Sequence, residues 1–240
     1  MRYFTWNNVR LVLMVGLILA LYAFSGKRNS ARKLTGCEVR FTGPENLFLT
    51  EQAVNKLLIE KDGRAQSIQR DWVDLNRLER AVERHRMVEK SEVFVGIDGV
   101  LKAVVKQKTP IARVFVRDSS FYVDSKGNAM PLSSQYTARV PIVTGSLDQE
   151  KMTKVAGVLK MVYDDPFLKK NIIGVRVMPS GAMVMENRNF DFDIDYGKPV
   201  NTKRKFENYK AFFQKAAGDS TIKKYKKISL RFNNQVVCTK

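Results

Sequence analysis

One uninterrupted apolar segment near the N-terminus, residues 11–24 (LVLMVGLILALYAF), limits the folds that are open to this chain. As an α-helix at about 1.5 Å per residue it covers roughly 21 Å, less than the roughly 30 Å hydrocarbon core of a bilayer. Extension from Tyr3 to Gly26 gives about 36 Å and includes a single charged residue, Arg10. Because Arg10 lies near one end, its side chain can snorkel toward the headgroups, so a membrane-spanning helix is physically feasible.

Three interpretations of this segment remain open: a single-span anchor, a cleaved signal peptide and a buried core helix. Arg2 and Arg10 suit the basic start of a signal peptide, and Ala23-Phe24-Ser25 offers a small-x-small cleavage site. The anchor is favoured, with Tyr3, Phe4 and Trp6 as an interfacial aromatic belt.

The charges that flank the segment do not fix its orientation. Lys27, Arg28, Arg32 and Lys33 follow it and outnumber Arg2 and Arg10 before it. The positive-inside rule therefore disfavours a cytoplasmic N-terminus.

The composition excludes several kinds of catalytic site. The 240 residues include one His and two Cys, and no CxxC pair. A zinc site of the His/Cys kind needs three or four such ligands, and only His85, Cys37 and Cys238 exist. Any Ser-His-Asp or Cys-His arrangement would have to use His85. These observations favour a binding or structural role without catalytic residues, metal or cofactor.

Residues 36–108 predict a small α+β module. A helix is expected from Glu51 to Lys61 with Thr50 as its N-cap, and Asp98-Gly99 is a strong hairpin signal. The predicted order is strand, helix, helix, strand, strand, so that two helices cover one face of a three-stranded sheet. The predicted elements are residues 37–41, 51–61, 74–85, 88–97 and 100–108.

Residues 109–240 predict a mostly antiparallel β domain with flanking helices. A second hairpin is expected at Pro179-Ser180-Gly181, and the last strand follows from one face that alternates between Ile228 and Cys238. Helices are expected at residues 151–163 and at 202–217, the second ended by Gly218. The other predicted strands are residues 113–117, 121–123, 138–144, 175–178, 182–185 and 190–196.

Polar clusters that suggest chemistry have plainer explanations. Asp191, Asp193 and Asp195 fail the calcium-loop pattern and, at period two on a strand, are expected to form a solvated face. His85 is expected to be a partly protonated surface cap at a helix C-terminus. Cys37 and Cys238 are expected to stay unpaired, because they fall in separate modules.

The strong basic excess is concentrated near the C-terminus. The chain has 42 Lys and Arg against 24 Asp and Glu, and residues 198–227 hold ten basic and two acidic residues. Aromatic residues are interleaved there, but Phe206, Tyr209 and Phe213 have helical spacing, which indicates the core-facing stripe of an amphipathic helix. A solvated face or a contact with an acidic surface is therefore favoured, and nucleic-acid binding is not expected.

Taken in order, these features resemble the bacterial cell-division family FtsQ/DivIB. Ser229 stands where the family usually has Asp. The segments that carry the resemblance are Phe41-Thr42-Gly43 with Leu49-Thr50-Glu51-Gln52-Ala53-Val54, Lys108-Thr109-Pro110-Ile111-Ala112, Phe121-Tyr122-Val123-Asp124-Ser125-Lys126-Gly127, Val140-Pro141-Ile142-Val143-Thr144-Gly145, Tyr196-Gly197-Lys198 and Ile228-Ser229-Leu230-Arg231-Phe232.

The resemblance implies a non-enzymatic divisome scaffold in the cytoplasmic membrane at the septum, with a cytoplasmic N-terminus and an extracytoplasmic bulk. Its partners would be small single-span coiled-coil proteins of the FtsB and FtsL kind, and through them the septal peptidoglycan synthase. The implied organisation is a tail (residues 1–10), a transmembrane helix (11–26), a linker (27–35), a POTRA-like module (36–108) and an FtsQ-type β domain (109–240). The alternative is a secreted or anchored POTRA-type module in envelope protein assembly or transport.

The last predicted strand is the expected docking site. A strand near the end of the chain is a natural sheet edge, whose free N–H and C=O groups can accept a strand from a partner. The expected contact residues are Phe232, Asn233, Asn234, Gln235, Val236 and Val237, with Leu230 and Arg231 adjoining.

Overall fold

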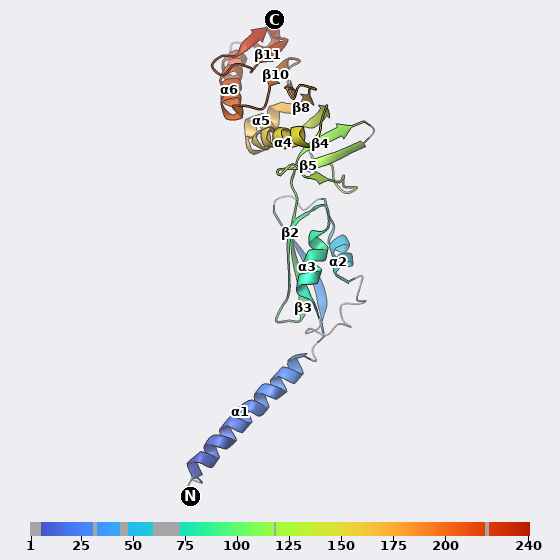
Figure 1. Cartoon of the computed structure of the whole chain (residues 1–240), viewed down its shortest axis with the longest axis vertical. Coiled ribbons are helices and arrows are strands. Elements are labelled where there is room, and N and C mark those ends of the chain that lie inside the picture. Colours follow the sequence, from blue (N-terminus) through green and yellow to red (C-terminus); the bar gives the residue numbers. More distant parts are fainter. Residues whose placement is uncertain (1–5, 31–32, 44–47, 60–72, 118, 219–220) are drawn as a thin grey trace. The chain divides into compact units, whose positions relative to one another are not determined.

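The computed structural model shows an α+β chain that separates into two compact units, Met1–Gln107 and Lys108–Lys240 (Figure 1). The first unit contains an N-terminal apolar helix and a three-stranded sheet, and the second contains a nine-stranded mixed sheet. The structure describes residues 6–30, 33–43, 48–59, 73–117, 119–218 and 221–240.

The apolar segment forms the helix α1 (Trp6–Ser30). Its stretch Asn8–Lys27 is long and apolar enough to cross a membrane, and none of it is buried inside the protein. The interpretation as a buried core helix is therefore wrong. The helix continues through Lys27 into the basic stretch that was expected to be a linker, while Tyr3, Phe4 and Arg32 lie outside the described residues.

The three-stranded sheet has the order β1-β3-β2, with β3 (Val100–Gln107) in the centre. β1 (Gly36–Thr42) runs parallel to β3, and β2 (Val88–Val95) runs antiparallel to it. The hairpin predicted at Asp98-Gly99 is confirmed, because it joins β2 to β3.

Two helices pack on this sheet, α2 (Glu51–Ile59) on β1 and α3 (Leu75–Glu83) on β2. Thr50 caps α2 through a hydrogen bond from the Ala53 amide to its Oγ1 (3.2 Å), as predicted, and the predicted end of this helix at Lys61 lies outside the described residues. Val54 and Val82 from the helices and Val105 from β3 are fully buried. The helices and the sheet therefore enclose a core of their own.

The larger sheet has the order β12-β11-β10-β9-β8-β7-β4-β5-β6. Among its described pairs, five are antiparallel and three are parallel (β4 with β7, β7 with β8, β10 with β11). Its strands are β4 (Pro110–Val116), β5 (Ser119–Asp124), β6 (Ala129–Met130), β7 (Ile142–Gly145), β8 (Ile172–Val177), β9 (Met183–Asn187), β10 (Asp193–Gly197), β11 (Lys227–Ser229) and β12 (Val237–Thr239).

Three helices share a core with this sheet: α4 (Gln149–Asp164), α5 (Pro166–Asn171) and α6 (Thr202–Gly218). The rings of Phe167 in α5 and Phe213 in α6 meet edge to face, with centroids 5.0 Å apart. A 3-10 turn, Thr221–Lys224, follows α6. The aromatic stripe predicted for α6 is confirmed, since Phe206 and Tyr209 are buried.

Three predicted features differ from the structure: the state of His85 in the first unit and the bounds of two strands in the nine-stranded sheet. His85 is half-buried, its Nδ1 accepts a hydrogen bond from the Met87 amide (3.3 Å), and burial lowers its pKa. The imidazole thus accepts a hydrogen bond within the turn after α3, and both its burial and its lowered pKa disfavour the partly protonated surface cap that the sequence predicts. The predicted strand 138–144 is shortened to β7, and the strand predicted at 190–196 begins only at Asp193.

Candidate functional site

The C-terminal end of the chain forms one end of the large sheet. β12 pairs antiparallel with β11, so that Ile228 faces Cys238 and Ser229 faces Val237 across the hairpin. β11 in turn lies parallel to β10. Within the part of the chain that the structure describes, no strand pairs with the outer side of β12. This outer side is the candidate site.

The final segment is a hairpin and not the single long strand predicted from its alternation. Residues 230–236 connect β11 to β12 without strand structure. Asn233 and Asn234 in this loop are residue types that favour turns, and Ile228 and Cys238 keep the same parity in a hairpin as in one strand. The alternation therefore could not distinguish the two arrangements.

The predicted contact residues divide into three groups. Leu230 is 1% exposed and belongs to the core, so its side chain supports the hairpin from inside. Arg231 and the loop residues Phe232, Asn233, Asn234 and Gln235 are exposed. Val236 packs partly against the core, and Val237 is the first residue of β12. Of the eight residues, Val237 alone lies on the open edge strand.

Asp195 in β10 holds the start of the loop in place. Its Oδ1 accepts a hydrogen bond from Arg231 Nε (2.9 Å), its Oδ2 lies 3.1 Å from Lys227 Nζ, and its main-chain oxygen accepts from the Leu230 amide (2.9 Å). The side chain is only 5% exposed. Burial raises the pKa of this carboxyl, but the hydrogen bonds and charges of Arg231 and Lys227 prevail and hold the pKa below its ordinary value.

The expectation that Asp195 belongs to a solvated acidic face is therefore wrong. Asp193, two residues earlier, is exposed as expected. The difference arises because β11 and the loop after it, more than thirty residues further along the chain, cover Asp195 and supply its two cationic partners.

A buried lysine joins α6 to the end of β10. Lys205 Nζ donates to the main-chain oxygens of Tyr196 (2.7 Å) and Lys198 (2.9 Å) and lies 4.5 Å from the centre of the Tyr196 ring. Burial lowers the pKa of Lys205, and the charge of Asp195 opposes that shift. Gly197 lies between the two carbonyl groups with φ +72°, and a Cβ there would meet Arg231 Cγ at 3.1 Å. The backbone can make this close approach because residue 197 is glycine.

Asn201, which precedes α6, and Asn208 within α6 also fix the tip of the loop. Asn201 Nδ2 donates to Asn233 Oδ1 (3.0 Å), and Asn208 Nδ2 donates to the Asn233 main-chain oxygen (2.9 Å). Asn233 is therefore engaged with its own chain, and it positions the loop. Phe232, which precedes Asn233 in the loop, is 49% exposed.

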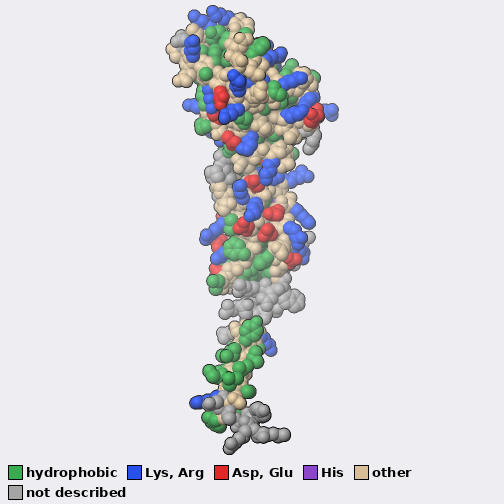
Figure 2. Space-filling model, turned by 60° about the vertical axis from the view of Figure 1, so that its left-hand side comes forward, with side chains coloured by type: hydrophobic (Ala, Val, Ile, Leu, Met, Phe, Trp, Pro, Cys, Tyr) green, Lys and Arg blue, Asp and Glu red, His purple; other side chains and the backbone are tan. Residues whose placement is uncertain are grey.

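Basic side chains surround the hairpin. Figure 2 shows lysine and arginine side chains spread over the C-terminal part of the surface in view. Near the hairpin the exposed basic residues are Lys223, Lys224, Lys226, Lys227, Arg231 and Lys240. Asp195 is paired with two of these residues and Asp193 is an exposed acid in the same strand, so among the described residues near the open edge the basic side chains outnumber the acidic ones.

The open edge of β12 is suited to binding an extended segment of another chain. An open sheet edge offers main-chain donors and acceptors to an extended segment of another chain. Among the described residues, no group of three or more His, Cys, Asp or Glu side chains is placed to hold a metal ion. Both cysteines are free thiols, and Cys238 in β12 has its pKa raised by burial.

Comparisons with known proteins give one similar solved structure and one matching family model. A solved structure, the major extracytoplasmic domain of the trans isomer of the bacterial cell division protein DivIB from Geobacillus stearothermophilus, is similar to this chain with 16% identity and a TM-score of 0.32. The similarity covers 48% of this chain and 97% of that one. Among curated proteins there is no match.

The second finding concerns the C-terminal unit. The family model described as "FtsQ/DivIB, C-terminal related" matches residues 109–239, which include the whole nine-stranded sheet and the open edge. Because this match covers more than half of the 240 residues, the chain belongs to the FtsQ/DivIB, C-terminal related family.

Proposed function

We propose that this chain is a non-enzymatic scaffold of the bacterial divisome that binds a partner by strand addition at β12. Membership of the FtsQ/DivIB family supports a role in cell division. The observation that carries the proposed binding mode is the open outer side of β12 at the end of the nine-stranded sheet.

The anchoring of the scaffold follows from α1. This single apolar helix fits a single-pass membrane protein. The proposed topology has residues 1–10 in the cytoplasm and the two folded parts outside it, at the division septum. The proposed parts are a POTRA-like module, residues 36–108, and an FtsQ-type β domain, residues 109–240.

Strand addition uses the backbone for affinity and side chains for selection. An extended partner segment beside β12 would continue the sheet through main-chain hydrogen bonds. Val237, 41% exposed, and Phe232 supply apolar contact beside that edge. Asp195 and Asn233 keep the loop in a fixed position before binding, which reduces the ordering cost of association.

The proposed partners are small single-span coiled-coil division proteins of the FtsB and FtsL kind, through which the scaffold connects to septal peptidoglycan synthesis. The exposed basic residues around the hairpin would attract acidic residues next to the added strand and speed the encounter. The same positive charge explains the basic excess of the C-terminal region without nucleic-acid binding.

A pair of proline variants tests the edge. Successive backbone N–H groups of a strand point in opposite directions, so of Val237→Pro and Cys238→Pro one removes an outward donor and the other a donor toward β11. The outward variant should keep the unfolding temperature of the purified chain and lose recovery of small division proteins from membranes. Full recovery with every folded proline variant would show that partners bind elsewhere.

Val236→Pro serves as the matched control, because Val236 precedes β12 and lies in the connecting loop. It should disturb partner recovery less than the outward proline.

Sequencing of the mature N-terminus separates the anchored scaffold from the alternative of a released POTRA-type module. An intact Met1 agrees with the anchor, whereas a start near Gly26 shows a cleaved leader.

A further inference from the structure

The turn between β2 and β3 carries the most exposed large hydrophobic side chain among the described residues. Ile97 is 96% exposed, more than Tyr22 (80%) or Trp6 (77%) of the apolar helix. The turn is closed by a hydrogen bond from the Gly99 amide to the Gly96 oxygen (3.0 Å). Isoleucine has no special ability to form turns, and here its side chain leaves the protein surface. Phe94, at the end of β2, is also exposed (44%).

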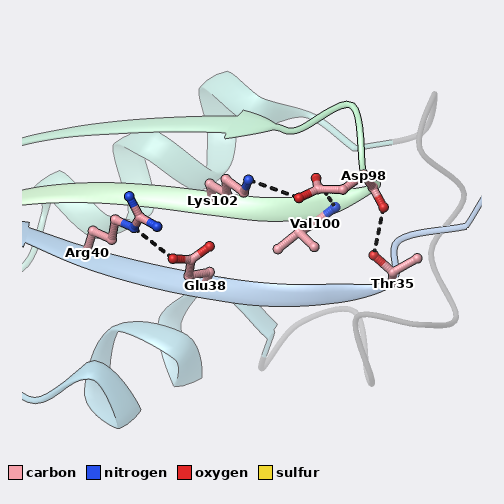
Figure 3. Close-up of polar contacts among 6 residues, drawn as sticks. All are labelled: Thr35, Glu38, Arg40, Asp98, Val100 and Lys102. Atoms are coloured by element: carbon pink, nitrogen blue, oxygen red, sulfur yellow. Dashed lines mark hydrogen bonds and ion pairs between the residues drawn. The ribbon is translucent and has the colours of Figure 1, made fainter.

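The sheet topology places this turn beside the entry of the chain from α1. Because β1 runs parallel to β3, the start of one strand lies next to the start of the other, with Gly36 opposite Val100. The Thr35 amide donates to the Gly99 oxygen (3.0 Å), and Thr35 Oγ1 donates to the Asp98 oxygen (3.1 Å). Figure 3 shows Thr35 directed toward Asp98 across the two strands.

The connection from α1 to this point is short. α1 ends at Ser30, and Leu34 is already buried in the module (2% exposed). Four Cα-to-Cα steps separate these two residues, so the chain can span at most about 14 Å between them. This short connection allows the turn to reach the headgroup layer at the Lys27 end of the candidate span.

The charges near the turn suit a lipid surface. The carboxylate of Asp98 is 3.0 Å from Lys102 Nζ and accepts a hydrogen bond from the Val100 amide (3.1 Å). Glu38 on β1 is likewise paired with Arg40 (2.7 Å), as Figure 3 shows. Lys33 is exposed at the end of the connection. Asp98 and Glu38, the described acids named here, are thus paired with basic residues, and the exposed Lys33 can meet lipid phosphates.

We propose that the β2–β3 turn rests in the lipid interface, with Ile97 inserted among the headgroups and the first acyl carbons. The three-stranded module is then attached to the bilayer at two points, α1 and Ile97, which limits its rotation about the connection. This inference rests on the membrane anchoring in the proposed function and is independent of the strand addition at β12.

Fluorescence quenching in vesicles tests the proposal on the full chain. In a background with Cys37→Ser and Cys238→Ser, a single cysteine at position 94 carries an environment-sensitive fluorophore, and the vesicles contain lipids brominated near the headgroup. The label should be quenched with Ile97 present. Ile97→Asp should reduce the interface-bound population roughly tenfold, because the apolar side chain is lost. Ile97→Val should retain the quenching.

Two further labelled positions serve as controls. A label at position 200, in place of the exposed Val200 of the second unit, should not be quenched. A label at position 18, in place of Ile18 in α1, should be strongly quenched by lipids brominated deeper in their acyl chains. Quenching at 18 but not at 94 overturns the inference and leaves the anchored scaffold intact. Lack of quenching at position 18 shows that α1 does not span the bilayer, and this result overturns both the insertion of the turn and the anchored scaffold.

Discussion

The edge strands of the two sheets differ in length and in charge. β1 and β2, the edges of the three-stranded sheet, are seven and eight residues long. They carry ion pairs at their exposed positions, Glu38 with Arg40 and Lys90 with Glu92. β12 has three residues, Val237, Cys238 and Thr239, and none is charged. Charged side chains on an edge discourage pairing with other strands, and both end strands of the nine-stranded sheet lack them, since β6 at its other end consists of Ala129 and Met130. Of these two ends, we propose that β12, which lies next to exposed basic residues, binds the partner.

The largest predicted effect is a loss of stability in two core variants, which tests whether the two sheets unfold as independent units. Ile228 in β11 is fully buried and supports β12, and Leu101 is buried in β3. Each change to alanine should cost about 3 kcal/mol of unfolding free energy, because it removes core contacts and leaves a cavity. In thermal unfolding, Ile228→Ala should lower the transition of the C-terminal unit and Leu101→Ala that of the three-stranded module.

A shift of a single common transition by both variants would contradict this independence. Partner recovery provides a second readout. It should fall with Ile228→Ala, which weakens the support of β12, and remain with Leu101→Ala.

The second prediction concerns the buried carboxylate that holds the loop before β12. Asp195→Asn should lower the unfolding free energy by about 2 kcal/mol near neutral pH, because two charge-assisted hydrogen bonds weaken. Since the folded-state pKa of Asp195 lies below its ordinary value, this stabilisation is present above about pH 4 and disappears as the pH falls through the folded-state pKa. Denaturant unfolding of both chains at several pH values measures the difference.

Asp193→Asn is the matched control for that experiment. Asp193 lies in the same strand and is exposed, so the change should alter the unfolding free energy by less than about 0.5 kcal/mol. An equal effect of the two variants would show that the contacts of Asp195 with Arg231 and Lys227 do not stabilise the fold.

The third prediction gives β12 the kind of charge that the edges of the three-stranded sheet carry. Val237→Lys should weaken partner binding roughly tenfold, because it removes an exposed apolar contact and places a charge on the edge that disfavours pairing with another strand. Titration of the purified chain with the recovered partner measures the affinity. Leu132→Lys, at an exposed aliphatic residue that follows β6 at the other end of the sheet, should leave the affinity unchanged, and equal affinities for all three chains would exclude Val237 from the contact.

The smallest predicted effect comes from removing the ion pair of the edge strand β2. Lys90→Thr combined with Glu92→Thr replaces an exposed ion pair of β2 with residues that favour strands. The variant should show weak self-association that grows with concentration, as measured by sedimentation velocity. If it stays as monodisperse as the unchanged chain, charge is not what protects this edge.

Local sequence signals predicted much of the fold because their structural causes are local. Asp98-Gly99 and Pro179-Ser180-Gly181 each gave a hairpin, and Gly99 and Gly181 have positive φ as such turns require. Thr50 caps the helix that it was expected to cap. The spacing of Phe206 and Tyr209 correctly identified the buried stripe of α6.

The missed features depend on contacts between distant segments. The residues next to Asp195 in the sequence do not predict that its side chain is buried. Its partners Lys227 and Arg231 are brought to it by the parallel pairing of β10 with β11. The asparagines at 233 and 234 were the available signal for a turn between Ile228 and Cys238. The alternation of apolar residues concealed it, since a hairpin and a single strand give these two residues the same parity.

Amide hydrogen exchange of residues 237–239, measured with and without the bound division protein, tests the central claim most directly. If the partner adds a strand to β12, the outward-facing amides of this segment become hydrogen-bonded and their exchange slows strongly. The long edge β2 should exchange equally in both states. Binding that leaves the exchange of β12 unchanged would contradict strand addition at this edge.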